Sequence, residues 1–149
     1  MSNDLIYLDV DQIEVPSWAR SIDRAYMEES ISDRGIIKPL IVAKVGDKYL
    51  LVDGVGRLEV AKKNNITKVP CRVVEVESED QALLLAIELE YTKKTWGLEY
   101  TFRVIQELEK QGYPRTEIAK ILRIPRSTLY RIITIMELPE ELKYLRDLF

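Results

Sequence analysis

Histidine is absent from this chain of 149 residues, and Cys71 is its single cysteine. Without a second thiol no internal disulfide can form. Without histidine, the usual zinc sites and histidine-based catalytic triads have no ligands or general base. Cys71 lies in an alternating, strand-like run, which favours a buried structural thiol over a reactive one. We therefore predict neither catalytic nor metal-binding residues.

Long hydrophobic runs are also missing. The longest uninterrupted apolar run, Ala82–Ile87, is far shorter than a membrane span, and the N-terminus lacks a basic region followed by an apolar core. With 46% hydrophobic and 32% charged residues, the chain can bury one moderate core or two small ones. We expect a cytoplasmic protein with no membrane partner.

The first half alternates strand and helix patterns. Pro39 interrupts a β-branched run and indicates either an edge position or the start of a strand. The expected elements, in chain order, are a strand over Leu5–Val15, a helix over Arg24–Asp33, a hairpin of Ile36–Val45 with Lys48–Asp53, a short helix after Asp53, and a strand over Val69–Val76.

The pattern changes abruptly from strand to helix at Asp53-Gly54-Val55-Gly56-Arg57. Glycines let the backbone approach a bound group, a helix N-terminus directs N–H groups outward, and Arg57 adds a cation in the first turn. This combination suits an anion. The alternative is a tight corner whose glycines only relieve steric strain, and one Gly-x-Gly-Arg does not decide between the two.

The second half is helical. Ser78-Glu79-Asp80-Gln81 fits a capping box that begins a helix ending near Tyr91, and Tyr100–Gln111 forms another amphipathic helix. The acidic stretch Glu75–Asp80 predicts the domain boundary, with an α/β domain over 1–77 and a helical domain over 78–149. A last helix starts at Glu140. The chain ends within an apolar pattern, so we expect a longer natural protein.

Two short helices with a tight corner are expected over about 115–136. Leu129, Ile132, Ile133 and Met136 share one apolar stripe of the second helix. The first helix has a shorter stripe, and the segment Arg123-Ile124-Pro125 separates the two because proline disfavours helical geometry in the residue before it. This is the layout of a helix-turn-helix.

The outer face of the second helix is polar and basic. Arg126 and Arg131 can each donate paired hydrogen bonds to guanine or phosphate, and Ser127, Thr128 and Tyr130 add hydroxyl groups. Residues 111–136 contain five basic residues and one acidic residue, although the whole chain has a net charge of −3. Such a basic segment favours DNA binding over the alternative, a helical hairpin with a merely solvated face.

Several motifs, in this order, resemble the ParB partition family. They are Gly35-Ile36-Ile37-Lys38-Pro39-Leu40-Ile41-Val42, Asp53-Gly54-x-x-Arg57 with Ala61-Lys62, Ile66-Thr67-Lys68-Val69-Pro70, Arg126-Ser127-Thr128 and Leu138-Pro139-Glu140-Glu141. The resemblance covers nearly the whole chain. It implies an α+β protein, with a small mixed-sheet ParB/sulfiredoxin-like domain followed by an all-α helix-turn-helix domain.

The resemblance also implies a function in plasmid or chromosome segregation. The partners would be centromeric (partition-site) DNA, a ParA-type ATPase and a second copy of the chain in a homodimer or larger assembly, on the nucleoid or a plasmid. A further centromere-binding protein is another candidate partner. The expected DNA-binding residues are Arg115, Arg123, Arg126, Ser127, Thr128, Tyr130 and Arg131.

Departures from the family pattern bear on nucleotide binding. CTP-binding ParB proteins usually show Gly-Glu-Arg-Arg at the positions of residues 54–57, where this chain keeps the glycine and the last arginine. They usually show Glu-Asn-x-x-Arg at the positions of residues 88–92, where only the glutamate is kept. Ala43 stands where an arginine is common. Each lost charge-assisted hydrogen bond costs about 1.5–3 kcal/mol. The resemblance implies CTP with Mg²⁺ as the candidate cofactor, and we expect at most a weak site and weak NTPase activity. The candidate residues are Gly54, Gly56, Arg57 and Glu88.

One more departure lies at the helix-turn-helix corner. Arg123 stands where the family usually has glycine. We expect Arg123 to adopt a left-handed conformation, at a cost of about 1 kcal/mol, unless the turn is built differently.

Two other functions stay open. The chain could be an adaptor that bridges another centromere-binding protein to the ATPase without reading DNA itself. It could also be an enzyme such as the free-serine kinases of the superfamily, whose Asp-Gly-His-His-Arg resembles Asp53, Gly54 and Arg57, with Glu28 or Glu29 as base. Sulfiredoxin chemistry is excluded because no cysteine stands at 54–57.

Overall fold

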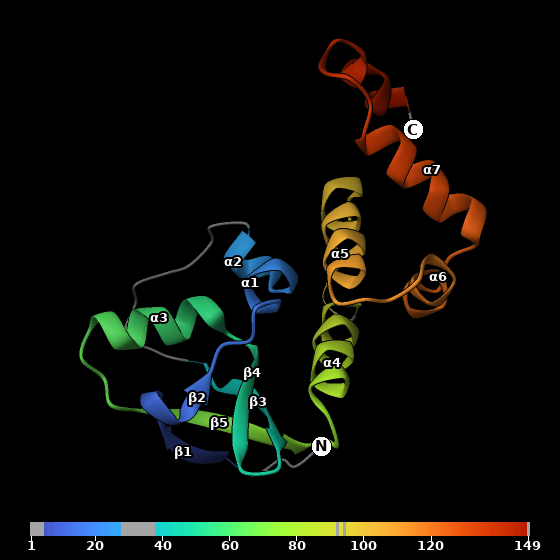
Figure 1. The fold of residues 1–149 in the computed structure, drawn as a ribbon. Coiled ribbons are helices and arrows are strands. Elements are labelled where there is room, and N and C mark those ends of the chain that lie inside the picture. Colours follow the sequence, from blue (N-terminus) through green and yellow to red (C-terminus); the bar gives the residue numbers. More distant parts are fainter. Residues whose placement is uncertain (1–4, 28–37, 92, 94, 149) are drawn as a thin grey trace. The chain divides into compact units, whose positions relative to one another are not determined.

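The computed structural model describes residues 5–27, 38–91, 93 and 95–148 of the chain. Two compact units follow each other in sequence, Met1–Lys94 and Thr95–Phe149. The first combines strands and helices and the second is helical (Figure 1). The predicted α+β class is therefore confirmed.

A five-stranded mixed sheet with strand order β1-β5-β3-β4-β2 is the framework of the first unit. The strands β5 and β3 pair in parallel, whereas β1 with β5 and β3 with β4 are antiparallel. The predicted hairpin and the strand predicted from Val69 are confirmed. The strands are β1 (Leu5–Asp9), β2 (Ile13–Glu14), β3 (Leu40–Val45), β4 (Lys48–Asp53) and β5 (Lys68–Glu75).

The prediction of one strand over Leu5–Val15 is wrong. A 3-10 turn, η1 (Val10–Gln12), interrupts it, and the Val10 N–H donates to the Thr67 carbonyl at 2.9 Å. β1 and β2 therefore lie at opposite edges of the sheet. Pro39 comes just before β3, a central strand, so the strand-start interpretation is confirmed and the edge interpretation is wrong. At this place its missing N–H costs the sheet no hydrogen bond.

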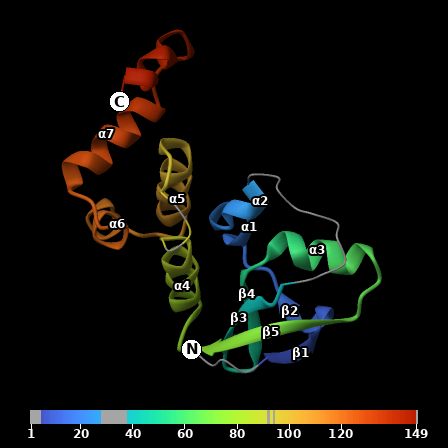
Figure 2. The ribbon, with the colours of Figure 1, turned by 180° about the vertical axis from the view of Figure 1, so that it is seen from behind.

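The helices of the first unit are α1 (Ala19–Ile22), α2 (Arg24–Met27), α3 (Val55–Lys63) and α4 (Glu79–Tyr91). In both views α1, α2 and α3 lie on one side of the curled sheet (Figures 1 and 2). Trp18, Leu51 and Leu58 are almost completely buried in this core. The predicted helix over Arg24–Asp33 begins as α2, and its later residues lie outside the described ones.

α4 belongs to the first unit, whereas the sequence predicted a boundary before it. Half of the predicted capping box is present, because the Gln81 N–H donates to Ser78 Oγ at 3.3 Å. Gln81 Oε1 accepts at 2.7 Å from the N–H of Glu77, one residue before the cap position. The apolar face of α4, with Leu83 and Ile87, is buried, and α4 packs against β4 and α1. A polar connection therefore precedes α4 without ending the unit.

The second unit contains α5 (Leu98–Lys110), α6 (Arg115–Leu122), α7 (Arg126–Met136) and the 3-10 segment η2 (Glu140–Leu148). α7 contacts the other three elements. The last predicted helix is present as the 3-10 segment. Gly112 follows α5 with a φ of +97°, the left-handed conformation that commonly ends a helix. Across the described part of the chain, every helix is too short or too polar to cross a lipid bilayer.

Candidate functional site

The helix pair α6–α7 has the predicted helix-turn-helix layout. Ile118 and Leu122 of α6 and Leu129 and Ile133 of α7 are buried, with Leu129 completely so. The apolar stripes are thus largely buried, while Ile132 and Met136 of α7 are half-buried. The polar face of α7 therefore remains on the outside of the second unit.

The predicted left-handed residue lies in the turn between the two helices. Arg123 has φ +59° and ψ +39°. Its N–H donates to the Lys120 carbonyl at 3.1 Å, and the Ile124 N–H donates to the Ala119 carbonyl at 3.0 Å. These two hydrogen bonds make a Schellman motif, which usually takes glycine at this position. The turn is thus built like a glycine turn, with an arginine in it.

The residues predicted to contact DNA lie on this outer face. Arg126, Ser127 and Arg131 are exposed, Thr128 is half-buried, and the aromatic side chain of Tyr130 is 46% exposed. No side chain caps the N-terminus of α7. Within the part of the chain that the structure describes, Arg126 and Arg131 make no ion pair. Their charges therefore remain available to an outside partner.

Two contacts hold Arg115 in place. Its guanidinium lies 5.3 Å from the centroid of the Tyr130 ring, and its Nε is 3.5 Å from Glu109 Oε2. The contact with Tyr130 joins the start of α6 to the outer face of α7. Arg115 thus positions Tyr130 as well as adding charge, a pairing that the sequence pattern did not reveal.

The strand-to-helix corner of the first unit is filled by a side chain of the protein itself. Oδ2 of Asp23, a residue only 3% exposed, accepts hydrogen bonds from the N–H groups of Gly54 at 3.2 Å and Val55 at 3.0 Å. Its Oδ1 accepts from Ala25 at 3.1 Å and more weakly from Tyr26 at 3.4 Å. The anion expected at this corner is therefore the Asp23 carboxylate, and a phosphate at the same two amides would have to displace it.

The other predicted nucleotide-binding residues lie in α3 and α4. Arg57 donates to Asp53 Oδ2 at 3.0 Å and to the Pro39 carbonyl at 2.9 Å, so its guanidinium is used inside the unit. Gly56 is buried within α3, and Glu88 lies on the exposed face of α4. The kinase bases considered above, Glu28 and Glu29, lie outside the described residues.

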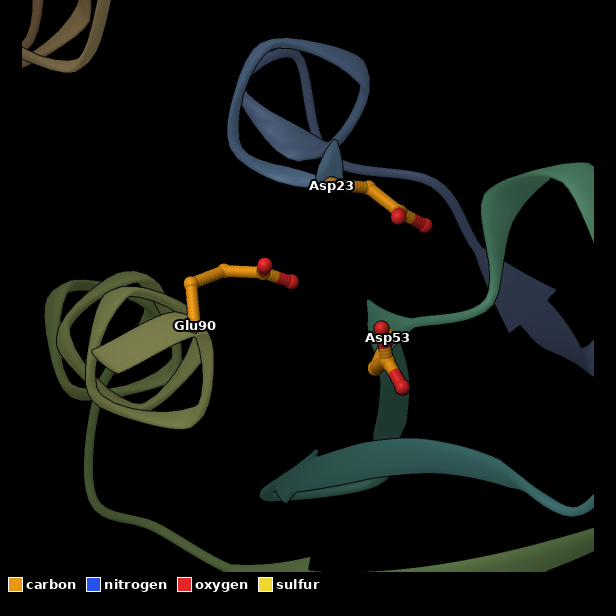
Figure 3. Close-up of side chains that lie close together, drawn as sticks. All are labelled: Asp23, Asp53 and Glu90. Carbon is orange, nitrogen blue, oxygen red and sulfur yellow. The ribbon is translucent and has the colours of Figure 1, made fainter. Parts of the chain in front are cut away.

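Three carboxylates meet beside this corner. Only Asp53 among them was named from the sequence, as part of a motif, and the cluster was not predicted. Oxygens of Asp23, Asp53 and Glu90 lie within 4.8 Å of one another, converging from α1–α2, the end of β4, and α4 (Figure 3). Oxygens of this kind suit hard divalent cations. Here Lys93 Nζ already lies 3.0 Å from both Asp53 Oδ1 and Glu90 Oε1. The cluster is therefore a salt-bridged structural junction between α4 and the corner.

Burial shapes the ionisation of this junction. Burial raises the pKa of Glu90 above its ordinary value, and Lys93 offsets part of that rise. Burial lowers the pKa of Lys93, but Asp53 and Glu90 together outweigh burial, so the net pKa of Lys93 is raised. The lysine thus stays charged while the glutamate is harder to ionise than usual.

A pH-dependent stability follows from Glu90. Between the ordinary carboxyl pKa of 4.5 and the raised one, the unfolded chain has lost a proton that the folded chain keeps. The free energy of unfolding therefore falls as pH rises through this window. Relative to Glu90→Gln, which does not titrate, the unaltered chain should lose stability in urea titrations as pH rises above the ordinary carboxyl pKa of 4.5. A difference that is constant with pH would contradict the assignment.

Cys71 is buried, as predicted, with its Sγ 3.5 Å from the Val69 carbonyl oxygen. Burial raises its pKa to about 11. Since the thiolate is the reactive form, the side chain is chemically quiet in the folded protein.

Comparisons with known proteins match the N-terminal and C-terminal parts of the chain to two different domain families. The sequence model of the ParB N-terminal domain matches residues 4–89, and that of the helix-turn-helix domain of resolvase matches residues 103–134. One curated relative is a probable chromosome-partitioning protein ParB of Borreliella burgdorferi, 21% identical over 139 residues. Another is a probable plasmid-partitioning protein ParB of Thermus thermophilus, 33% identical over 98 residues.

These alignments cover 93% and 65% of this chain but 54% and 33% of the two relatives, so the chain spans about half their length or less. Among solved structures, it resembles the C-terminally truncated chromosome-partitioning protein ParB from Caulobacter crescentus complexed to the centromeric parS site. That likeness covers 94% of this chain and 76% of the other, at a TM-score of 0.50 and 17% identity. It is a likeness of fold.

Proposed function

Because the chain belongs to the ParB N-terminal domain family, we propose that it is a DNA-binding partition protein, acting in plasmid or chromosome segregation with a ParA-type ATPase. The observation that carries this proposal is the outer face of α7. Arg126 and Arg131 are exposed there and, among the described residues, free of acidic partners. The name of the Caulobacter crescentus structure, a ParB complexed to a centromeric site, supports the same function.

In this proposal α7 is the recognition helix. Its N-terminal residues enter the major groove, where Arg126 reads guanine and Ser127 contacts a base or phosphate. Arg131, one turn further along, lies nearer the phosphates. Because one helix-turn-helix reads only a few base pairs, two copies of the chain would bind a two-fold site.

A selection followed by a titration tests the proposal. The chain is immobilised, a pool of random duplexes is passed over it, and the retained duplexes are sequenced. The enriched duplex and a scrambled duplex of equal composition are then titrated at two salt concentrations. A specific reader keeps its preference at the higher salt, because base contacts depend on salt less than phosphate contacts. Equal and steeply salt-dependent binding to both would overturn sequence-specific recognition.

Arg126→Ala should weaken binding to the enriched duplex by about 1–3 kcal/mol and relax its specificity. The reason is the loss of a bidentate contact to guanine. Arg103→Ala, which removes an exposed cation from α5, is the matched control and should change little. An equal loss on every sequence would make Arg126 a phosphate contact, and no loss would remove it from the interface.

A second candidate function is an adaptor between another centromere-binding protein and the ATPase. The net charge of −3 favours it, because an acidic chain is repelled by DNA at long range. An adaptor of this kind would bind neither the enriched nor the scrambled duplex in the titration above.

A further inference from the structure

Strand β1 lies at one edge of the sheet, on the outer side of β5 in both views (Figures 1 and 2). Three consecutive apolar side chains are exposed on it: Leu5 is 46% exposed, Ile6 40% and Tyr7 65%. In the described part of the first unit, no other large hydrophobic side chain is this exposed. Scattered apolar residues are normal on a protein surface, whereas a contiguous group at a sheet edge marks an interaction site.

The two edges of the sheet differ. β2, at the opposite edge, has only two residues and is soon followed by Pro16, so it offers a partner little backbone. β1 has five residues and, from Leu5 to Leu8, contains no charged residue, proline or glycine. Natural edge strands use shortness, charge, proline and bulges to prevent pairing with another chain. β1 is therefore the edge that is open to a further strand.

The register of β1 with β5 shows which backbone groups face outward. Hydrogen-bonded and non-hydrogen-bonded pairs alternate along an antiparallel ladder. The Val10 N–H donates to the Thr67 carbonyl at 2.9 Å, and this contact continues the register of the two strands. Every second residue before Val10 therefore bonds to β5. The residues between them, Leu5, Tyr7 and Asp9, direct their N–H and C=O groups away from β5.

Two observations agree with this direction. Tyr7 lies opposite Pro70, which has no N–H to donate to it. The Asp9 N–H donates to Gln12 Oε1 at 3.0 Å instead of to β5. Because the Asp9 N–H is already used, the backbone groups available to a partner strand are those of Leu5 and Tyr7.

We propose that β1 pairs with β1 of a second copy of the chain, so that two five-stranded sheets join into one. The two strands run antiparallel about a two-fold axis at Ile6. Leu5 of each copy then lies opposite Tyr7 of the other. Because both residues direct backbone groups outward, each of these two pairs exchanges two hydrogen bonds. One strand thus supplies both halves of the contact, as a two-fold interface requires.

The side chains favour the same register. Leu5 and Tyr7 are two positions apart and lie on one face of β1, so an aliphatic side chain meets an aromatic one in each pair. On the other face, Ile6 meets Ile6 of the other copy. A register with Tyr7 on the axis would instead pair Leu5 with Asp9 and would need the N–H that Gln12 already binds.

This contact lies in the first unit and involves neither DNA nor the outer face of α7. The inference is therefore independent of the proposed function, and its test needs no duplex. The contact is small, so the dimer should be weak and should form only as the protein concentration rises.

Sedimentation velocity of the unaltered chain tests the proposal. The mean mass should approach that of a dimer as the concentration rises from about 10 μM to about 1 mM. The double variant Leu5→Lys, Tyr7→Lys places lysine opposite lysine in both pairs and should weaken association by about tenfold or more. The double variant Leu5→Glu, Tyr7→Glu should do the same. An equimolar mixture of the two variants should associate again, because lysine then lies opposite glutamate.

Tyr144→Lys is the matched control. Tyr144 is as exposed as Tyr7, at 65%, but lies in η2, so its replacement should leave the dimer unchanged. The replaced residues of β1 are exposed, so both double variants should keep the melting temperature of the unaltered chain.

A pair of proline variants tests the direction of the backbone groups. Tyr7→Pro removes an N–H that faces outward, so the melting temperature should change little while the dimer is lost. Ile6→Pro removes an N–H that bonds to β5 and should lower the melting temperature of the first unit by about 4 °C or more.

Three results would overturn the proposal. One is an unaltered chain that stays monomeric over the whole concentration range. Another is a dimer that persists in the double lysine variant or in Tyr7→Pro. The third is a mixture of the lysine and glutamate variants that stays monomeric, because the two-fold register brings their opposite charges together.

Discussion

Replacing Asp23 with alanine is expected to lower the free energy of unfolding of the first unit by about 3–5 kcal/mol. The variant loses the N-terminal cap of α2, where Asp23 Oδ1 accepts from Ala25. It also leaves the N–H groups of Gly54 and Val55 without their acceptor in a buried corner. Urea unfolding followed by Trp18 fluorescence, in a Trp96→Phe background, reports on this unit alone, because Trp18 is buried within it.

Two variants make the Asp23 experiment specific. Asp23→Asn keeps one acceptor oxygen, so its loss should be intermediate. Asp11→Ala removes an exposed carboxylate from η1 and should change stability by less than about 0.5 kcal/mol. Equal stability of Asp23→Ala and Asp11→Ala would show that the carboxylate does not hold the corner.

Replacing Gly54 with alanine is expected to cost about 3–4 kcal/mol, through backbone strain and overpacking together. Gly54 has a φ of +110°, which a side chain resists, and a Cβ there would lie 2.5 Å from Leu40 Cδ2. Leu40 is completely buried, so it has little room to move away. The same Trp18 fluorescence measurement applies.

Two other glycines separate the strain from the clash. Gly46 has a φ of +59°, and a Cβ added there would have no neighbouring atom within 4 Å, so Gly46→Ala should cost about 1–2 kcal/mol through strain alone. Gly97 has neither strain nor a close neighbour, and Gly97→Ala should be nearly neutral. If Gly54→Ala and Gly46→Ala lose the same stability, the contact with Leu40 relaxes and the overpacking argument fails.

Local chemistry was predicted well from sequence. The left-handed Arg123 followed from the resemblance, because the family usually has glycine at this corner. The Ser78 cap followed from residue types three positions apart. The exposed face of α7 followed from the spacing of its apolar residues. Each of these features depends on neighbours within a few positions along the chain.

Long-range partners could not be predicted in the same way. Asp23 fills a corner formed by Gly54 and Val55, thirty-one residues further on, and nothing in the local pattern marks it as their acceptor. The apolar face of α4 showed that the helix is buried but not against which unit. Periodicity fixes the inward face of an element, whereas its packing partner depends on topology.

The two glutamates of α4, Glu88 and Glu90, show that the sequence did not predict which side chains are buried even within one helix. Matching the family motif selected Glu88, but helical geometry places that residue on the exposed face of α4. Glu90, two positions later, is only 2% exposed and lies beside Asp53. A shift of two residues turns a helical side chain to a different face. Motif matching therefore named Glu88 as a nucleotide-binding candidate and did not predict the buried junction that Glu90 forms.

The most direct test is a two-dimensional ¹H–¹⁵N NMR titration of the chain with the selected duplex. The account predicts that the amide shifts that change are concentrated in α6, the turn and α7, from Thr116 to Arg131, while the amides of β3 stay in place. Changes concentrated in β3 and the corner around Gly54, or none at a saturating duplex concentration, would contradict it.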